Sequence, residues 1–316
     1  MKQHNNAKGS VILCTAALLW GLAFVVQSEA ADRIPPFLFN SLRSIIGSLF
    51  LFLLLVIRRL VRKTPIFPKG TKNMRRWLLG GLLCGTLLTV SLSLQQFGLS
   101  VYPDGVAVEA RAGFLTALYV LLVPLFTLLS GKRISLPILI AIAVATVGIY
   151  LLCLSDGLHN IYLGDVLVFA CAFFFTFHIL AVSYFDDVDG IALSMMQFAT
   201  CAVLSGILSF FGAPVTLAVL SSAIPNLLYL GIVSSGIAYT MQIIGQKYAD
   251  PTVASLSMSL ESVFAALGGW IILKNALSLR EFLGCALMFL AILLAQLPQF
   301  LQSKKRVDLS KKEGES

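Results

Sequence analysis

The amino-acid sequence predicts an all-α membrane protein whose ten transmembrane helices form two inverted five-helix repeats. Three observations support this prediction: apolar stretches of membrane-spanning length, a one-sided distribution of Lys and Arg, and a partial resemblance between the two halves of the chain. Of the 316 residues, 58% are hydrophobic and only 12% are charged, and the mean hydropathy is +0.90. This composition excludes a soluble globular domain.

The apolar stretches follow one another along almost the whole chain. About 20 residues of helix cross the hydrocarbon core of a bilayer, which is ~30 Å thick. Stretches of about this length predict helices over residues 11–29, 37–57, 77–98, 105–130, 135–154, 164–184, 190–212, 222–246, 251–273 and 279–301. All six Cys residues fall within these stretches without a Cys-x-x-Cys spacing, which indicates packing residues rather than disulfides.

The basic residues predict the orientation of the helices. With the N-terminus in the cytoplasm, most of the 23 Lys and Arg residues face inward, including the cluster at 58–76, and only Arg33, Lys274 and Arg280 face outward. This asymmetry predicts a cell (inner) membrane protein with both termini cytoplasmic. It accounts for the net charge of +8 without nucleic acid as a partner. Membrane lipid is the expected surrounding, and attraction of anionic lipid is an alternative explanation of the 58–76 cluster.

The first apolar stretch allows a second interpretation. Lys2 and Lys8 precede it, and Ser28-Glu29-Ala30 at its end resembles the small-residue pattern of a signal-peptidase site. Cleavage there would leave nine helices. The length of the stretch, its interruption by Trp20-Gly21 and the internal repeat favour a retained first helix.

The two halves of the chain resemble one another in the order of their features. Residues 9–26 align without a gap to 164–181, and residues 103–116 align to 250–263. Because five is an odd number, a second five-helix repeat enters the membrane from the opposite side. Inverted repeats are typical of secondary transporters, whose halves exchange roles around a central site. The expected segments are a first repeat at 9–155, a second repeat at 160–302 and a charged cytoplasmic tail at 303–316.

Small residues one helical turn apart predict close packing between helices. They occur at Gly81 and Gly85, Ala141 and Ala145, Gly231 and Ser235, and Ala265 and Gly269. Such pairs let helix backbones approach one another in a membrane, but they are common in helical bundles and do not define a function.

Glu261 is the first candidate for the functional site. It lies about ten residues into the predicted helix 251–273, near the middle of the bilayer, with no Lys or Arg one turn away. An ionised side chain at this depth costs about 2.5–3.5 kcal/mol, so such residues usually have a function. Burial favours a protonated carboxyl, which makes Glu261 a candidate for substrate binding and for proton coupling. A protonated Glu that only hydrogen-bonds a neighbouring helix is the alternative.

The predicted helix 105–130 carries two more charged residues near its outer end. Glu109 and Arg111 are two positions apart, so they point to roughly opposite faces and cannot pair. Arg111 shares a face with Phe114, and both are candidates for the transport path, with snorkelling of Arg111 to the surface as the alternative. Glu109 is shallower and is a candidate for proton coupling in a solvated vestibule. Arg43, two turns into its helix, is interpreted as a packing or interface residue.

Uncharged polar and aromatic side chains complete the predicted cavity. Each of them alone is more often a contact between helices than a ligand contact, but the set occurs on helices of both halves. Its members are Trp20, Gln95, Gln96, Tyr119, His178, Tyr239 and Gln242. One His within the helices does not suffice for a metal site, and no cofactor is expected. Pro103, Pro124 and Pro251 predict breaks or kinks in the fourth and ninth helices.

Five segments of the chain resemble the EamA-type carriers of the drug/metabolite transporter superfamily. No single motif is specific, but their order and spacing over roughly residues 9–300 are. The segments are Ala17–Phe24 (ALLWGLAF), Leu94–Leu99 (LQQFGL), Ala110–Phe126, Leu260–Trp270 (LESVFAALGGW) and Ser278–Gly284 (SLREFLG). The resemblance implies two inverted repeats and a central cavity lined by the first, third, fourth, sixth, eighth and ninth helices.

The chain departs twice from the pattern of this family. The family usually has Pro directly after the Glu of the ninth helix, where this chain has Ser262. It also commonly has an acidic Gly-Glu at the end of that helix, where this chain has Lys274-Asn275. The first departure predicts a straighter helix. Because of the second, the role that the family's terminal acid plays is not assigned to a residue of this chain.

These features together predict a secondary transporter and not an enzyme. It would move a small metabolite, amino acid or drug-like solute across the plasma membrane by alternating access, with export as one direction. The chain has no Walker A, HExxH or GxSxG motif, so neither an ATP-driven pump nor a membrane-embedded enzyme has a recognisable site. A channel is the other alternative, weakened by the lack of a repeated filter element. The oligomeric state is left open.

Overall fold

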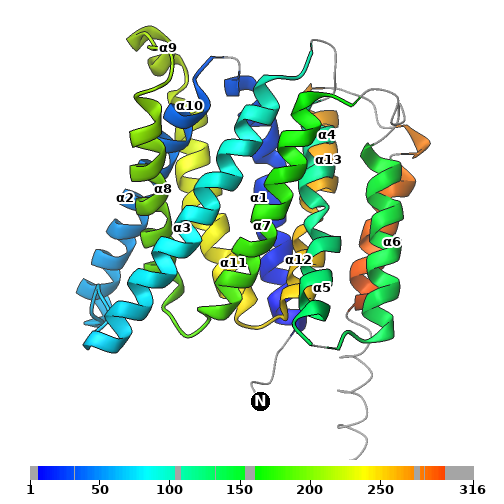
Figure 1. Ribbon diagram of the computed structural model, residues 1–316, viewed down its shortest axis with the longest axis horizontal. Helices are drawn as coiled ribbons and strands as arrows, with labels where there is room; N and C mark the ends of the chain where they lie inside the picture. Colours follow the sequence, from blue (N-terminus) through cyan, green and yellow to red (C-terminus); the bar gives the residue numbers. More distant parts are fainter. Residues whose placement is uncertain are drawn as a thin grey trace, which may run out of the picture.

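Helices standing side by side make up the molecule (Figure 1). The computed structural model describes residues 6–31, 33–103, 108–131, 133–153, 161–273, 278–280 and 282–295. Within these ranges the regular structure is entirely helical, which confirms the predicted all-α class.

The helices of the first half follow the predicted apolar stretches closely. One predicted helix, 105–130, is divided at Leu118 into two shorter helices. The helices are α1 (Asn6–Ala31), α2 (Pro36–Arg62), α3 (Thr71–Ser100), α4 (Val108–Ala117), α5 (Tyr119–Leu129) and α6 (Leu136–Cys153).

The second half is more segmented than the first. Its helices are α7 (Leu163–Tyr184), α8 (Gly190–Ser209), α9 (Leu217–Ser222), α10 (Ile224–Leu228), η1 (Tyr229–Ala238), α11 (Tyr239–Gln246), α12 (Pro251–Met258) and α13 (Glu261–Leu273), followed by a helix at Phe282–Ala295. The π-helix η1 joins α10 to α11 in one continuous stretch, and π-helical turns are often found at functional sites.

Eight helical stretches among the described residues are long and apolar enough to cross a membrane. They correspond to the first four and to the sixth to ninth predicted helices. Two shorter apolar helices, Leu136–Leu151 and Phe282–Ala295, lie where the fifth and tenth were predicted. Eight spans are therefore supported by length and composition, and the count of ten stays a prediction.

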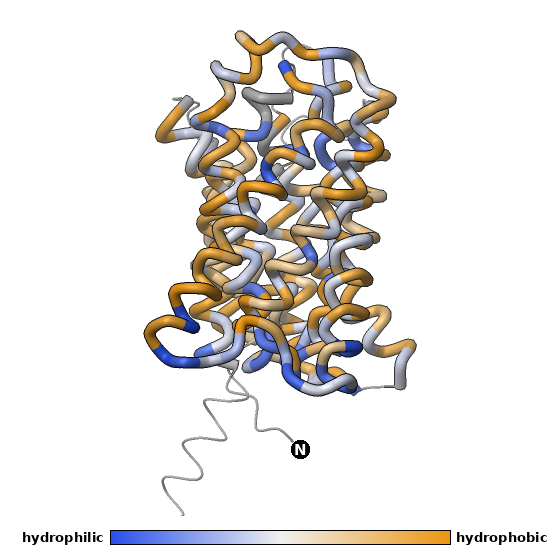
Figure 2. Tube along the Cα trace, turned by 90° about the vertical axis from the view of Figure 1, so that its left-hand side faces the viewer, coloured by the Kyte–Doolittle hydropathy of each residue, from blue (hydrophilic) through white to orange (hydrophobic). Residues whose placement is uncertain are grey.

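Apolar and polar residues are separated along the height of the bundle. Hydrophobic residues cover its flanks, whereas hydrophilic residues gather at the end where the N-terminus lies (Figure 2). Large apolar side chains such as Leu49, Leu53 and Val203 are exposed on these flanks. Such a surface is stable against lipid and unstable against water, which agrees with a multi-span membrane protein.

The two halves pack into one another instead of forming separate bundles. α2 lies along α8, α3 lies against α7 and α8, and α1 contacts η1, α11 and α13. Glycine makes several of these contacts possible: a Cβ on Gly81 would lie 2.1 Å from Cγ of Met196, and one on Gly85 would lie 2.5 Å from Cβ of Thr200. The predicted close packing at this pair is thus present. α1 is part of the packed interior.

The predicted helices 105–130 and 251–273 are each broken near the middle. The break between α4 and α5 lies at Leu118, and the break between α12 and α13 lies at Ser259–Leu260. The prediction that Ser262 straightens the ninth helix is wrong. The hydroxyl of Ser259 donates to the Leu256 carbonyl at 2.8 Å, and that of Ser262 donates to the Ser259 carbonyl at 2.8 Å. These bonds satisfy main-chain carbonyls of the broken turn without a proline.

The two breaks at Leu118 and Ser259–Leu260 do not coincide with prolines, and kinks at the prolines stay a prediction. Pro124 lies inside α5, and Pro251 is at the first turn of α12, where a missing N–H costs nothing. Pro103 precedes α4 and lies outside any helix. The breaks therefore depend on local hydrogen bonding and packing, which the positions of the prolines do not reveal.

Candidate functional site

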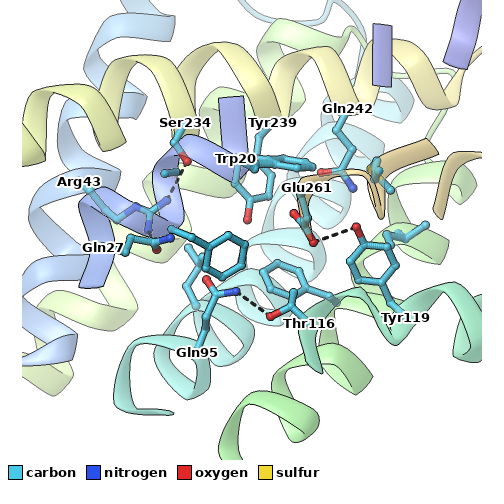
Figure 3. A pocket seen from close by; sticks show the side chains of 16 residues that line it. Trp20, Gln27, Arg43, Gln95, Thr116, Tyr119, Ser234, Tyr239, Gln242 and Glu261 are labelled. Carbon is cyan, nitrogen blue, oxygen red and sulfur yellow. Dashed lines mark hydrogen bonds between the residues drawn. The ribbon is translucent and has the colours of Figure 1, made fainter. Parts of the chain in front are cut away.

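A pocket opens at the centre of the bundle between the two halves (Figure 3). Its lining comes from α1, α2, α3, α4 and α5 of the first half and from α7, η1, α11, α12 and α13 of the second. The cavity among these side chains is small, at about 40 Å³. The pocket is therefore narrow in this conformation.

One side of the pocket is formed by a buried guanidinium. Arg43 on α2 is 1% exposed, and it is the largest fully buried side chain among the described residues. Its Nη1 donates to Oε1 of Gln27 at 2.7 Å, its Nη2 to the hydroxyl of Ser234 at 3.2 Å, and its Nε to the hydroxyl of Ser235 at 3.4 Å. All three acceptors are neutral, so their dipoles stabilise the positive charge of Arg43 but do not neutralise it.

The opposite side of the pocket carries a buried carboxyl group. Glu261 is the first residue of α13 and is 5% exposed. The hydroxyl of Tyr119, the first residue of α5, donates to Glu261 Oε1 at 2.9 Å. Each of the two residues directly follows a helix break, and the bond joins the first half of the chain to the second. The break thus places both polar groups in the pocket wall.

Aromatic rings lie between the two charged groups. The rings of Trp20 and Tyr239 are in edge contact with centroids 4.7 Å apart, and Figure 3 shows both between Arg43 and Glu261. Gln95 donates to the hydroxyl of Thr116 at 3.2 Å across the lower wall. The result is a polar pocket with an apolar middle.

Two polar atoms in this wall have no partner among the described residues. They are the indole Nε1 of Trp20 and Oε1 of Gln242. A buried donor or acceptor without a partner is costly, at about 1–3 kcal/mol. Groups of this kind in a pocket wall are typical of sites that complete their hydrogen bonds with a ligand.

Six of the predicted site residues line this pocket, and the others lie near it or elsewhere. Those in the pocket are Trp20, Gln95, Tyr119, Tyr239, Gln242 and Glu261. Gln96 is buried behind the wall and donates to the carbonyl of Gln27 at 3.4 Å. Phe114 packs into an apolar cluster between α4, α6 and α13. The side chain of Glu109 lies outside the part of the chain that the structure describes, as do Lys274-Asn275 and the 303–316 tail.

His178 lies one layer behind the pocket. Its ring is fully buried, Nε2 lies 3.0 Å from Oε1 of Gln197, and the ring is in edge contact with Tyr239 at 6.1 Å. It therefore supports a residue of the wall instead of forming the wall itself.

Arg111 belongs to a network at the end of the bundle where α4 and α7 begin. Its Nε and Nη2 donate to the two carboxylate oxygens of Asp165 at 2.5 and 2.7 Å. The same carboxylate accepts from the hydroxyl of Tyr102 at 2.8 Å and from the backbone N–H of Tyr162 at 2.8 Å. Burial raises the pKa of Tyr102, so its hydroxyl stays protonated and donates. The network ties α4 of the first half to α7 of the second.

The other end of the bundle has its own links between the halves. Arg58 Nη1 lies 2.8 Å from Asp189, and Arg76 Nε lies 2.6 Å from Asp187. Lys247 donates to the carbonyl of Val188. The three acceptors are neighbours in the connection between α7 and α8, so this connection is held from α2, α3 and the end of α11. We refer to this end, with residues 58–76, as the basic end.

Comparison with known proteins identifies the family of this chain. The model of the EamA-like transporter family matches it twice, at residues 7–154 and at residues 162–297. The chain belongs to this family. It is therefore also a member of the drug/metabolite transporter superfamily, as the sequence motifs implied.

Two relatives of this EamA-like protein are named as transporters. It is 27% identical over 306 residues to an "Uncharacterized transporter" of Archaeoglobus fulgidus, covering 94% of this chain and 90% of the relative. It is 22% identical over 286 residues to the "Uncharacterized transporter YoaV" of Bacillus subtilis, covering 87% and 92%. A solved crystal structure matches with a TM-score of 0.73 at 22% identity, covering 92% of this chain and 97% of that one. This match shows a shared fold.

Several residues of the EamA-like pocket escaped the sequence analysis. Arg43 was interpreted as a packing residue because its depth was known but the face of α2 that meets the pocket was not. Gln27, Thr116 and Ser234 were not singled out because small polar residues are common in membrane helices. Asp165, the partner of Arg111, lies at the edge of its predicted helix, where an acidic residue has no cost. A signal for Arg43 did exist: it is a charged residue well inside an apolar span.

Proposed function

We propose that this EamA-like protein is a secondary transporter that moves a small polar or amphipathic metabolite by alternating access. The pocket between Arg43 and Glu261 is the proposed substrate site. We further propose ten membrane-spanning helices in two inverted repeats, a location in the plasma membrane and a cytoplasmic basic end. The observation that carries the proposal is a central polar pocket whose walls come from both halves of an otherwise apolar bundle.

The directions of the helices support inverted repeats. α1 starts at the basic end, whereas α7, the first helix of the second half, starts at the opposite end (Figure 1). The two separate matches to the family model divide the chain between these same halves.

The packing pattern supports a two-fold relation as well. Exchange of α1 with α7, α2 with α8, α3 with the α10–η1–α11 stretch, and α4–α5 with α12–α13 converts each main contact into another. The contact of α3 with α7 becomes that of α11 with α1, and α3 with α8 becomes η1 with α2. The contact of α4 with α7 becomes that of α12 with α1, and α5 with α7 becomes α13 with α1. Two halves related in this way can each adopt the conformation of the other, which is the physical basis of alternating access.

The links at the two ends are the proposed gates. Arg111 and Asp165 hold α4 to α7 at one end, and the pairs to Asp187 and Asp189 hold α2 and α3 to the α7–α8 connection at the other. Opening the pocket to one side requires the links at that end to separate while those at the other end stay formed.

Solute counterflow in proteoliposomes tests the proposed function. Purified protein should accelerate exchange of a labelled solute against the same unlabelled solute, with saturation. Glu261→Gln should reduce this exchange about tenfold or more, because it removes a hydrogen-bonding carboxyl group from the site. Arg59→Gln, at an exposed position of α2 outside the pocket and the proposed gates, should leave it nearly unchanged. Comparing inward and outward gradients gives the direction of transport. Full flux and full pH dependence in Glu261→Gln would remove that residue from the site and from proton coupling.

A further inference from the structure

A second cleft lies at the basic end, away from the central pocket. Its volume is about 450 Å³, and its walls come from the end of α2, the 63–70 connection, the start of α3 and the α7–α8 connection. Figure 1 shows these segments at the same end of the bundle. Ligand pockets usually enclose about 300–1,000 Å³, so the cleft has room for a small charged group.

The wall of this cleft carries an excess of positive charge. Its charged side chains are those of Arg58, Arg62, Lys69 and Arg76, against those of Asp187 and Asp189. Arg58 and Arg76 are paired with the two acids. Arg62 and Lys69 form no ion pair within the part of the chain that the structure describes. The cleft therefore holds two cations more than its own carboxylates neutralise.

Two further donors of this wall lack an acceptor among the described residues. They are Nε of Arg58 and the hydroxyl of Thr64, and both atoms are shielded from water. Arg58 uses Nη1 for Asp189 at 2.8 Å, so its Nε is available to a second acceptor. A buried donor without an acceptor is unfavourable. A phosphate group offers several strong acceptor oxygens, and Arg and Lys are the residues that usually bind it.

The apolar surface next to the cleft indicates that the phosphate belongs to a lipid. Ile57, Leu60 and Val61, in the last turns of α2, are 46%, 76% and 75% exposed. Ile57 and Val61 each precede a cleft-lining arginine by one position, so they lie on the adjacent face of the same helix. A free phosphate would leave this surface uncovered, whereas the acyl chains of a lipid cover it.

We propose that this cleft binds the phosphate group of an anionic membrane lipid. Arg62 and Lys69 supply the positive charge, and Nε of Arg58 and the hydroxyl of Thr64 donate hydrogen bonds to the phosphate oxygens. The acyl chains lie along the exposed apolar face at the end of α2. Basic pockets between membrane helices are a common kind of site for such headgroups.

A lipid in this cleft competes with the links at the basic end. The carboxylates of Asp189 and Asp187, which pair with Arg58 and Arg76, are 43% and 49% exposed. Exposed ion pairs are weak, so a phosphate in the same cleft draws the two guanidinium groups away from the acids. Lipid binding does not depend on transport. Its effect on opening this end rests on the proposed function, in which these pairs are a gate.

Lipid titration of the purified full-length protein in a neutral detergent tests the site. The probes are phosphatidylglycerol, phosphatidylcholine with the same acyl chains, and inorganic phosphate, and binding is followed by thermal shift and native mass spectrometry. Phosphatidylglycerol should bind about tenfold or more tightly than either of the others. Equal binding of the two lipids would overturn the charge preference. Equal binding of inorganic phosphate would identify a soluble anion as the ligand and overturn the assignment to a lipid.

Two double variants with the same change of charge distinguish this site from general attraction to the basic end. Arg62→Gln with Lys69→Gln removes the two unpaired cations of the cleft and should weaken phosphatidylglycerol binding about tenfold or more. Arg59→Gln with Lys72→Gln removes one Arg and one Lys from exposed positions outside the cleft and should weaken binding about twofold or less. Melting temperatures without lipid check that both variants fold. Equal weakening by the two variants would show diffuse attraction, and the proposal would fail.

Replacing one acid of the cleft tests the competition. Asp189→Asn frees Arg58 and should strengthen phosphatidylglycerol binding about threefold or more. Asp250→Asn, the same change at an exposed position outside the cleft, is the control and should leave binding nearly unchanged. Equal effects of the two variants would show that the lipid does not compete for Arg58. Because none of these measurements requires solute exchange, they decide the lipid site even if the proposed transport function is wrong.

Discussion

At the scale of single residues, charged groups in this protein have different surroundings and therefore different energetic roles. Asp165 is buried, with its side chain 10% exposed, and receives hydrogen bonds from Arg111, Tyr102 and the Tyr162 backbone. The side chain of Asp189 is 43% exposed and pairs with Arg58 in a geometry open to water. Exposed pairs contribute little to stability, whereas removing one partner of a buried pair is costly.

We therefore expect replacement of these two acids to change stability by different amounts. Asp165→Asn should lower the free energy of unfolding by about 1–3 kcal/mol, because Arg111 loses its bidentate partner, and the melting temperature in detergent should fall by several degrees. Asp189→Asn should change the melting temperature much less, since that pair is exposed. Equal effects of the two substitutions would show that the Arg111–Asp165 network is not a main link between the halves.

The sequence analysis identified Glu261 on one side of the pocket and missed Arg43 on the other. Glu261 and Gln242 stood out because polar groups deep in apolar helices are costly and therefore informative. Arg43 also lies inside an apolar span, but nothing in the sequence tells which face of α2 meets the centre. Arg111 was identified without its partner, since Asp165 lies 54 residues further along the chain and only the fold brings them together.

At the scale of helices, two breaks lie at the wall of the pocket. Tyr119 and Glu261 are the first residues of α5 and α13, and their hydrogen bond joins the two broken spans. The sequence predicted irregularity in both spans, but it assigned the cause to prolines. At the second break, serine hydroxyls donate to main-chain carbonyls.

Removal of the Tyr119 hydroxyl tests the coupling between these helices. Tyr119→Phe deletes one hydrogen bond to Glu261 while keeping the ring, so transport should fall about three- to tenfold. Stability should change little because Glu261 can accept from a substrate or water. Tyr150→Phe on the exposed face of α6 is the matched control. The change is measured as the KM and maximal rate of counterflow, and unchanged values would argue that the bond has no part in transport.

Close contact between α1 and α13 also depends on one glycine. A Cβ on Gly21 would lie 2.4 Å from Cβ of Phe264 and 2.7 Å from the backbone of Ala265. Gly21→Ala should therefore push the two helices apart, cost about 1–3 kcal/mol and impair binding at the adjacent pocket. Gly269→Ala on α13 meets nothing within 4 Å and should be neutral. Melting temperatures of both variants check this, and a neutral Gly21→Ala would contradict the packing described.

At the scale of the whole molecule, the apolar stretches predicted the all-α class, because a single apolar segment of about 20 residues satisfies its backbone hydrogen bonds in a bilayer as a helix. The deep interlocking of the two halves could not be predicted in this way. It depends on which residues each small residue faces, such as Met196 opposite Gly81. These pairings cannot be read from an apolar sequence.

The topology gives a prediction for the whole chain. In a variant with its six Cys residues replaced, Asn73→Cys at the basic end and Ser221→Cys at the opposite end are both exposed positions. Impermeant thiol reagents should label the first only from the cytoplasmic side and the second only from outside. Labelling of both from the same side would contradict the arrangement of the helices in the membrane.

Access to the pocket from each side tests the central claim most directly. Ala23 lines the pocket, and a single Cys at this position reports on it in the same Cys-free background. A carrier with alternating access predicts labelling by a small impermeant thiol reagent from either side in separate experiments, with protection by a transported solute in both. Labelling from only one side, unchanged by any solute that the protein exchanges, would contradict the proposal that this pocket is the transport path.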